Sequence, residues 1–192
     1  PTGQLNAVVA YSPDGKRAYA ISMGSGLDDF DESAFSVSLN DGLTWNQIGL
    51  IDTNVDFLGD VAAAPDCNAL YVASTNLDAA CGCDSVWRRQ SEADYYAGKW
   101  QRVWCEKLTG ADEVGLLRLA EDATDGAYVV LGDQDSLKLY VSSNSGEIWS
   151  TKASDLYIQD MGVPTAKTIL TLDADACVAK STDNGWTWGD KV

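Results

Sequence analysis

The densest group of side chains that could do chemistry in this 192-residue chain is a run of carboxylates within residues 26–32. Its members are Asp28, Asp29, Asp31 and Glu32. Clustered carboxylates with flexible spacing suit a hard cation such as calcium, although the run lacks the spacing of an EF-hand loop. We therefore expect either a calcium site or a docking surface for a basic partner here. A solvated acidic face that only aids solubility is the competing interpretation.

Cysteine spacing argues for a disulfide rather than a metal site. The chain has no histidine, and one residue separates Cys81 from Cys83, whereas zinc ligands are usually two to four residues apart. Cys83 and Cys105 are equidistant from residue 94, the middle of a predicted hairpin, and antiparallel pairing brings such positions side by side. We predict a Cys83–Cys105 disulfide, with Cys81 as the alternative partner, and hence an oxidising compartment. Cys177 is expected to be a small buried hydrophobe, and Cys67 to be free or intermolecular.

Net charge restricts the partners. With 29 acidic and 13 basic residues the chain carries a formal charge of −16, which repels nucleic acid and anionic membrane surfaces. No apolar run reaches the ~18 residues of a spanning helix, so we expect no membrane insertion. The chain opens at Pro1 without a basic and apolar leader, and we expect any export signal to have been removed.

Short apolar runs separated by Gly, Asp and Asn turns predict strands throughout the chain. They fall into four units of four strands each. The predicted strands are residues 6–11, 17–22, 34–38 and 45–50; 60–64, 69–74, 85–90 and 99–104; 114–119, 126–131, 138–142 and 149–152; and 156–161, 168–172, 177–180 and 186–192.

A motif of the form Ser-x-Asp-x-Gly-x-Thr-Trp recurs at the turn between the third and fourth strands of three units. Its fixed positions are Ser38, Asn40, Gly42 and Trp45; Ser142, Asn144, Gly146 and Trp149; and Ser181, Asp183, Gly185 and Trp188. In the second unit only Gly98 and Trp100 remain. Asp or Asn can accept hydrogen bonds from turn amides, Gly permits a positive φ, and the Ser hydroxyl ties the ends of the hairpin.

The tryptophans that end the motif are separated by 55, 49 and 39 residues, close to the roughly 40 to 50 residues of one propeller blade. The motif resembles the Asp-box, or BNR repeat, of propellers such as sialidases, xyloglucanases, sortilin-type receptors and photosystem II assembly factors. The resemblance implies an all-β propeller of four four-stranded antiparallel blades at about residues 5–51, 57–106, 113–152 and 155–192. It also implies a structural role for the motif, because Asp-boxes in that family lie on an outer turn away from any catalytic centre.

The same resemblance raises the question of glycoside hydrolysis. A sialidase needs an arginine cluster, but four of the five arginines at positions 17, 88, 89, 102 and 118 fall on predicted outer strands or turns. Hydrolysis of the xyloglucanase kind needs two carboxylates across a cleft. Asp60, Glu113 and Asp160 lie near the starts of innermost strands and could reach a central channel.

Two functions therefore remain open at this level. The favoured one is a non-catalytic extracytoplasmic module, extracellular, cell-surface or periplasmic, that binds protein or glycan. The alternative is a glycoside hydrolase or a fragment of one. Trp87, Tyr95, Tyr96 and Trp104 could form a sugar-stacking cluster, although aromatics on an outer strand also serve packing. Four blades could close alone, pair with a second copy, or belong to a larger propeller.

Overall fold

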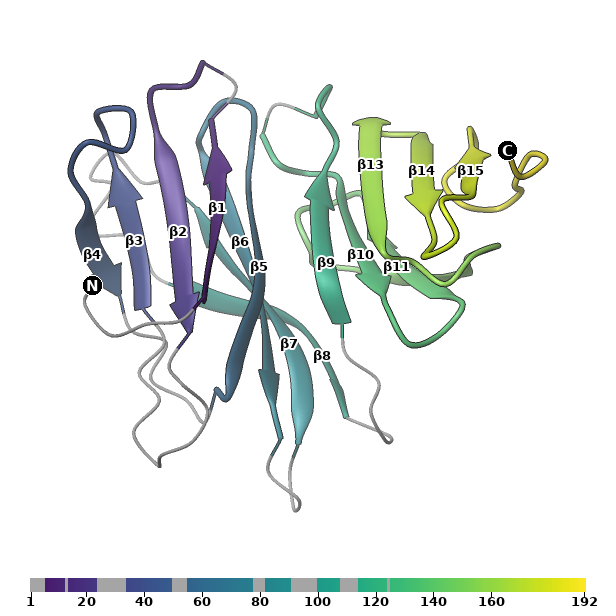
Figure 1. The fold of residues 1–192 in the computed structure, drawn as a ribbon, viewed down its shortest axis with the longest axis horizontal. Helices are drawn as coiled ribbons and strands as arrows, with labels where there is room; N and C mark the ends of the chain where they lie inside the picture. The colour runs from purple at the N-terminus through teal and green to yellow at the C-terminus, as the bar shows by residue number, and fades with distance from the viewer. Residues whose placement is uncertain are drawn as a thin grey trace.

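The computed structural model describes residues 6–12, 14–23, 34–49, 55–77, 82–90, 100–107, 114–123 and 125–192. These residues form strands, turns and irregular segments and contain no helix (Figure 1). No helix long and apolar enough to cross a membrane is therefore found in the described ranges.

The strands form four antiparallel sheets, and the strand order within each sheet follows the chain. Sheet I contains β1 (Asn6–Tyr11), β2 (Ala18–Met23), β3 (Ala34–Ser38) and β4 (Asn46–Gly49). Sheet II contains β5 (Phe57–Ala63), β6 (Ala69–Asn76), β7 (Cys83–Gln90) and β8 (Trp100–Lys107). Sheet III contains β9 (Val114–Leu119), β10 (Val129–Asp133), β11 (Lys138–Ser142) and β12 (Ser150–Ala153). Sheet IV contains β13 (Asp160–Thr165), β14 (Thr168–Leu172) and β15 (Val178–Ser181).

The four sheets stand in a row in chain order, with sheet I at one end and sheet IV at the other (Figure 1). The first strand of each sheet lies beside the first strand of the next, so that β1 contacts β5, β5 contacts β9 and β9 contacts β13. Over the part of the chain that the structure describes, this row does not close into a ring.

Sheets I to III largely follow the strand pattern expected from the sequence. Strands β1, β3, β9, β11 and β14 span the predicted residues, and most others differ at their ends by a few residues. Sheet IV departs in two places. Its first strand was expected at residues 156–161 but begins at Asp160, because Leu156 forms a turn with Ser154. The Leu156 amide donates to Ser154 Oγ (3.2 Å), and the Ser154 hydroxyl donates to Leu156 O (2.7 Å).

The prediction of a fourth strand at residues 186–192 is also wrong, since sheet IV has three strands. Three backbone hydrogen bonds still tie this segment to β15. Gly189 donates to Lys180 O (2.9 Å), and Val178 and Val192 exchange two bonds of 2.8 and 3.1 Å. The segment thus occupies the place of a fourth strand without a continuous ladder.

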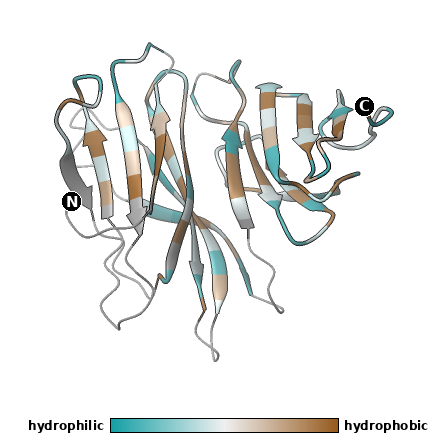
Figure 2. Cartoon of the chain, in the orientation of Figure 1, coloured by the Kyte–Doolittle hydropathy of each residue, from teal (hydrophilic) through white to brown (hydrophobic). Residues whose placement is uncertain are grey.

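Each buried apolar cluster joins two neighbouring sheets. Sheets I and II share Tyr19, Ile21, Phe35, Val37, Leu58, Val61, Leu70 and Val72. A second cluster joins sheets II and III, and a third joins sheets III and IV. The hydrophobic bands recur along the strands of every sheet in Figure 2. The core of this protein is therefore a series of sheet-to-sheet junctions.

Position in the row explains which strands are apolar throughout. Strands β6 and β10 belong to sheets II and III, which are covered on both faces, and nearly every residue along them is buried. The outer strand β8 is mostly exposed. Burial of both faces favours continuous apolar runs over alternation.

The three described motif turns share one hydrogen-bond pattern. The first serine accepts from the amide of the glycine four residues later, and the Asn or Asp accepts from the amide four residues beyond itself. The serine bonds are 2.9 Å for Ser38–Gly42, 2.9 Å for Ser142–Gly146 and 2.8 Å for Ser181–Gly185. The second bonds are each 2.9 Å, from Thr44 to Asn40, from Ile148 to Asn144 and from Thr187 to Asp183. Only an oxygen acceptor is required, which explains why asparagine replaces aspartate in two copies.

Two of these turns place a tryptophan against the preceding sheet. Trp149 Nε1 donates to Val103 O on β8 at 3.0 Å, and also to Gly146 O at 2.8 Å. Trp188 Nε1 donates to Ala153 O at the end of β12 at 2.8 Å. Trp100 instead packs edge-to-face on Phe35, with ring centroids 5.4 Å apart. At each junction the following sheet therefore contacts the preceding one through this tryptophan.

Two glycine substitutions test whether the motif turn at Gly146 packs against the neighbouring sheet II. Gly146 and Gly15 both have a positive φ, of 83° and 72°. A Cβ on Gly146 would lie 2.9 Å from Val103 Cγ2, whereas one on Gly15 meets nothing within 4 Å. We expect Gly15→Ala to lower the free energy of unfolding by about 1 kcal/mol. Gly146→Ala should lower it by at least ~1 kcal/mol more, because of overpacking. Urea unfolding measures both free energies of unfolding, and equal losses for the two variants would contradict close packing of the turn against sheet II.

Candidate functional site

The inner strands carry two of the carboxylates considered for hydrolysis, and one arginine engages both. Arg118 on β9 donates from Nη1 to Asp60 Oδ2 on β5 (2.6 Å) and from Nη2 to Asp160 Oδ1 on β13 (2.8 Å). Its Nε donates to Met161 O at 2.9 Å. The network therefore joins sheets II, III and IV. Glu113, the third carboxylate considered, lies outside the described residues.

Asp60 is buried and heavily hydrogen-bonded. Its Oδ2 accepts from the Leu117 amide at 2.9 Å, and its Oδ1 from the Val61 amide at 2.8 Å. Burial raises the pKa of Asp60, while these amides and Arg118 act in the opposite direction. Because an acid and a base for hydrolysis must both be free to reach a substrate, this arrangement favours a structural tie over a catalytic pair.

Three of the arginines make separate contacts in the described part of the chain. Arg118 lies on an inner strand, and Arg88 lies on β7, where its guanidinium donates to Ser145 O (2.6 Å) and Gln101 Oε1 (2.9 Å). Arg102 lies over the ring of Trp87, 5.8 Å from its centroid. This placement differs from the arginine cluster that grips a substrate carboxylate in a sialidase.

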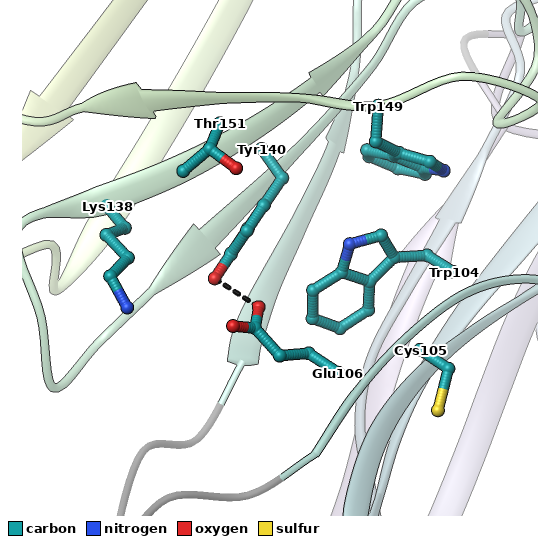
Figure 3. Close-up of a pocket in the computed structure, with 7 residues that line it drawn as sticks. All are labelled: Trp104, Cys105, Glu106, Lys138, Tyr140, Trp149 and Thr151. Atoms are coloured by element: carbon teal, nitrogen blue, oxygen red, sulfur yellow. Dashed lines mark hydrogen bonds between the residues drawn. The ribbon is translucent and has the colours of Figure 1, made fainter.

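A pocket of about 310 Å³ lies between sheets II and III (Figure 3). It is lined by Trp104, Cys105 and Glu106 of β8, Lys138 and Tyr140 of β11, Thr151 of β12, and Trp149. The volume is at the lower end of the ~300–1,000 Å³ typical of ligand pockets. Strand alternation brings the side chains together, since Trp104 and Glu106, like Lys138 and Tyr140, are two residues apart and share a face.

Three aromatic rings form the pocket wall. Trp104 lies 4.9 Å from Tyr140 and 6.5 Å from Trp149, measured between ring centroids, with interplanar angles of 57° and 58°. The two hydrogen bonds of the Trp149 indole hold that ring in place. Tyr140 is buried and donates its hydroxyl to Glu106 (Figure 3). The apolar wall is therefore held in place before any ligand arrives.

Polar groups surround the aromatic wall. Glu106, Lys138 and Thr151 are exposed at the pocket and provide a carboxylate, an ammonium and a hydroxyl. The two charges are opposite in sign, so the described part of the lining has no net charge. Aromatic faces with a few polar groups suit a ligand that has both apolar faces and hydroxyl groups.

The structure describes only some of the residues that the sequence predicts to form sites. Asp28, Asp29, Asp31 and Glu32 lie outside the described residues, so the calcium site stays a prediction, as do the places of Tyr95 and Tyr96. Among the residues that the structure does describe, no three His, Cys, Asp or Glu side chains are grouped so as to hold a metal ion.

Of the two predicted stacking aromatics that the structure describes, Trp104 lines the pocket and Trp87 does not. Trp87 instead donates its indole to Ser74 Oγ at 2.8 Å. Sequence reasoning assigned Trp149 only a structural role and did not select Glu106, Lys138 or Tyr140. The i, i+2 spacing of aromatic and charged residues on two strands was the signal available for them.

Cys83 and Cys105 are neighbours but not directly opposite each other. The register pairs Cys83 with Lys107 and Ser85 with Cys105, so the two cysteines are diagonal, and the predicted direct pairing is wrong. A register shift at Val86 and Trp87 displaces the strands. Both are free thiols. Burial of the Cys105 thiol raises its pKa, and a hydrogen bond with Cys83 raises that pKa further. The disulfide stays a prediction. Cys67 and Cys177 are also free and half-buried.

No protein-family model matches the chain, and no curated protein matches it. Solved structures do match. Hydrazine synthase of Kuenenia stuttgartiensis is similar over 92% of this chain and 58% of its own, with a TM-score of 0.64 and 14% identity. The GH74 xyloglucanase of Xanthomonas campestris is similar over 92% and 28%, with a TM-score of 0.62 and 11% identity. A Hadza microbial sialidase is similar over 97% and 44%, with a TM-score of 0.58 and 13% identity.

These likenesses concern the fold. They support the β-propeller architecture expected from the repeats, with four antiparallel sheets of three or four strands. The chain spans less than two thirds of each of these three chains.

Removing Arg118 tests the inner-strand network. Arg118→Met leaves the buried Asp60 carboxylate without its cation. We expect a loss of about 2–3 kcal/mol at neutral pH, less than the ~3–5 kcal/mol for a fully buried pair, because Arg118 is partly exposed. Since burial raises the folded-state pKa of Asp60, its protonated form is the better tolerated one, and stability falls as pH rises through that pKa. The loss should therefore shrink at about pH 4. Urea unfolding at both pH values measures this.

Arg102→Met is the matched control, since Arg102 is exposed and its described contact is with Trp87. It should cost less than ~1 kcal/mol. Equal losses for the two variants, or a larger Arg118→Met loss in acid than at neutral pH, would contradict the network.

Proposed function

We propose that this chain is a β-propeller module that binds a neutral glycan at the pocket between sheets II and III without hydrolysing it. The single observation that carries the proposal is the wall formed by Trp104, Tyr140 and Trp149, bordered by Glu106 and Lys138. A sugar ring offers C–H faces to aromatic side chains and hydroxyl groups to carboxylate and ammonium groups.

Charge narrows the class of glycan. The described lining residues include one carboxylate and one ammonium, while the whole chain carries −16. That field opposes the approach of an anionic sugar. A neutral saccharide is thus the better fit than a sialylated one.

The available carboxylates support binding over hydrolysis. A glycosidase places two carboxyl groups on opposite sides of the scissile bond, ~5–9.5 Å apart. Among the residues that the structure describes, Glu106 is the one carboxylate that lines the pocket. Asp60 and Asp160 are both paired with Arg118. Two of the similar structures are named as a xyloglucanase and a sialidase, which keeps hydrolysis as the second candidate.

We also propose an extracytoplasmic setting, extracellular, cell-surface or periplasmic. This part rests on the predicted Cys83–Cys105 bridge, because disulfides persist in oxidising compartments.

A glycan array followed by calorimetric titration tests the binding site. We expect signals from neutral rather than sialylated glycans. Trp104→Ala should weaken binding about fivefold to tenfold, since an aromatic contact contributes roughly 1 kcal/mol beyond its buried area. Glu106→Gln should also weaken binding. Because Glu106 is exposed, we expect this variant to fold, so that weaker binding reports on the site itself.

Trp186→Ala is the matched control, because Trp186 is an exposed tryptophan outside the pocket, seated over Lys152. Binding unaffected by Trp104→Ala and Glu106→Gln, or no binding to any glycan, would contradict the proposal. Release of sugar from chromogenic glycosides by the unsubstituted chain would replace binding with hydrolysis.

A further inference from the structure

A buried arginine ties the turn that carries Trp149 to sheet II. Arg88 on β7 is 7% exposed, and its Nη1 donates to Ser145 O at 2.6 Å. Its Nη2 donates at 2.9 Å to Oε1 of Gln101, the residue that pairs with Arg88 on β8. The guanidinium is therefore held by the neighbouring strand and directed at the motif turn of sheet III.

The carbonyl that Arg88 contacts belongs to the peptide group that joins Ser145 to Gly146. A peptide group is planar, so a bond that fixes its oxygen also fixes its N–H. The Gly146 amide donates to Ser142 Oγ (2.9 Å), and Gly146 O accepts the Trp149 indole N–H (2.8 Å). Arg88 thus acts one residue away from an acceptor that orients the Trp149 ring at the pocket wall.

The backbone of this turn benefits from an external tie. Ser145 and Gly146 both have a positive φ, of 61° and 83°. A positive φ at both central residues is characteristic of a type I′ turn, which prefers Asn, Asp or Gly at these places. The other two described motif turns have Asp41 and Asn184 at the first central position. Serine lacks their preference for the left-handed region.

The motif turn of sheet IV is tied to its preceding sheet at the same position by a different group. Tyr128, just before β10, donates its hydroxyl to Asn184 Oδ1 at 2.6 Å. Asn184 holds the place that Ser145 holds in the turn of sheet III. A tie at the first central residue is therefore common to both turns, and the arginine serves the turn whose tryptophan lines the pocket.

As a purely structural side chain, Arg88 is costly. It brings a positive charge into a buried position, and its Nε has no partner in the described part of the chain. The ion pairs among the described residues do not include it, and its two acceptors are neutral oxygens. Burial of a charge without an opposite charge costs free energy that an apolar side chain would avoid. Control of the turn at Ser145 accounts for an arginine at this place.

We infer that Arg88 is a positioning residue for the pocket between sheets II and III. It fixes the Ser145–Gly146 peptide group and, through that group, the ring of Trp149. The inference rests on the proposed binding of a neutral glycan at this pocket. Arg88 is not one of the described lining residues, so it acts through Trp149 rather than by contact with the sugar.

A double-mutant cycle between Arg88 and Trp149 tests this role by calorimetric titration. The probe is the neutral glycan with the strongest array signal. Arg88→Met should weaken binding about twofold to tenfold, the effect of one hydrogen bond. Trp149→Ala should weaken it about fivefold to tenfold. In the Trp149→Ala background Arg88→Met should have almost no further effect, because the arginine acts through that ring. Fully additive effects overturn the inference.

Hydrogen exchange of the Trp149 indole N–H reports on the ring without any glycan. Arg88→Met should speed this exchange. Arg88→Lys should give an intermediate rate, because an ammonium group can donate to Ser145 O but lacks the planar fork that also holds Gln101. Arg102→Met is the matched control, since Arg102 is an exposed arginine on β8 that contacts Trp87. It should change neither the exchange rate nor the Kd.

Urea unfolding establishes that Arg88→Met is folded in these assays, and Arg88→Lys takes its place in the cycle if it is not. A folded Arg88 variant with unchanged Kd and unchanged Trp149 exchange overturns the inference and leaves the proposed function intact. Absence of glycan binding by the unsubstituted chain refutes the proposed function, and the inference with it, before any variant is compared.

Discussion

Two of the three sheet-to-sheet junctions depend on an indole N–H that donates to the backbone of the preceding sheet in the row. Trp149 and Trp188 each donate to a carbonyl of an outer strand, and for the half-buried Val103 carbonyl the lack of a partner would be costly. The bond also fixes where one sheet lies along its neighbour, which apolar packing alone does not do. The motif turn is the device that aims the indole, since its serine and Asn or Asp acceptors fix the loop before the tryptophan.

The candidate binding site is a consequence of the same junction. Trp149 bonds to Val103 on one side and forms part of the aromatic wall on the other. Tyr140 belongs both to the core between sheets II and III and to the pocket, where it bonds to Glu106. A tryptophan of the repeated turn thus also lines the pocket where two units with different outer strands meet. The carboxylates of the inner strands make a different kind of contact, because Asp60 and Asp160 are both paired with Arg118.

Local features were predictable from the sequence, and contacts between units were not. Strands such as β9 and β11 lie at the predicted residues because each is a short apolar run between turn residues. Trp104 and Tyr140 lie 36 positions apart in the sequence, so their contact depends on how two sheets pack. Arg118 reaches across to two other sheets, which no spacing within its strand reveals. Cys83 is offset from Cys105 because the strands do not pair in the register of a hairpin centred on residue 94, and the register shift at Val86 and Trp87 contributes part of that offset.

Hydrogen exchange of the indole N–H protons, followed by NMR, tests the junction most directly. We predict slow exchange for Trp149 and Trp188, whose Nε1–H groups donate to backbone carbonyls, and fast exchange for Trp186, which is 72% exposed. Equal exchange rates for the three indoles would contradict the central role of this bond.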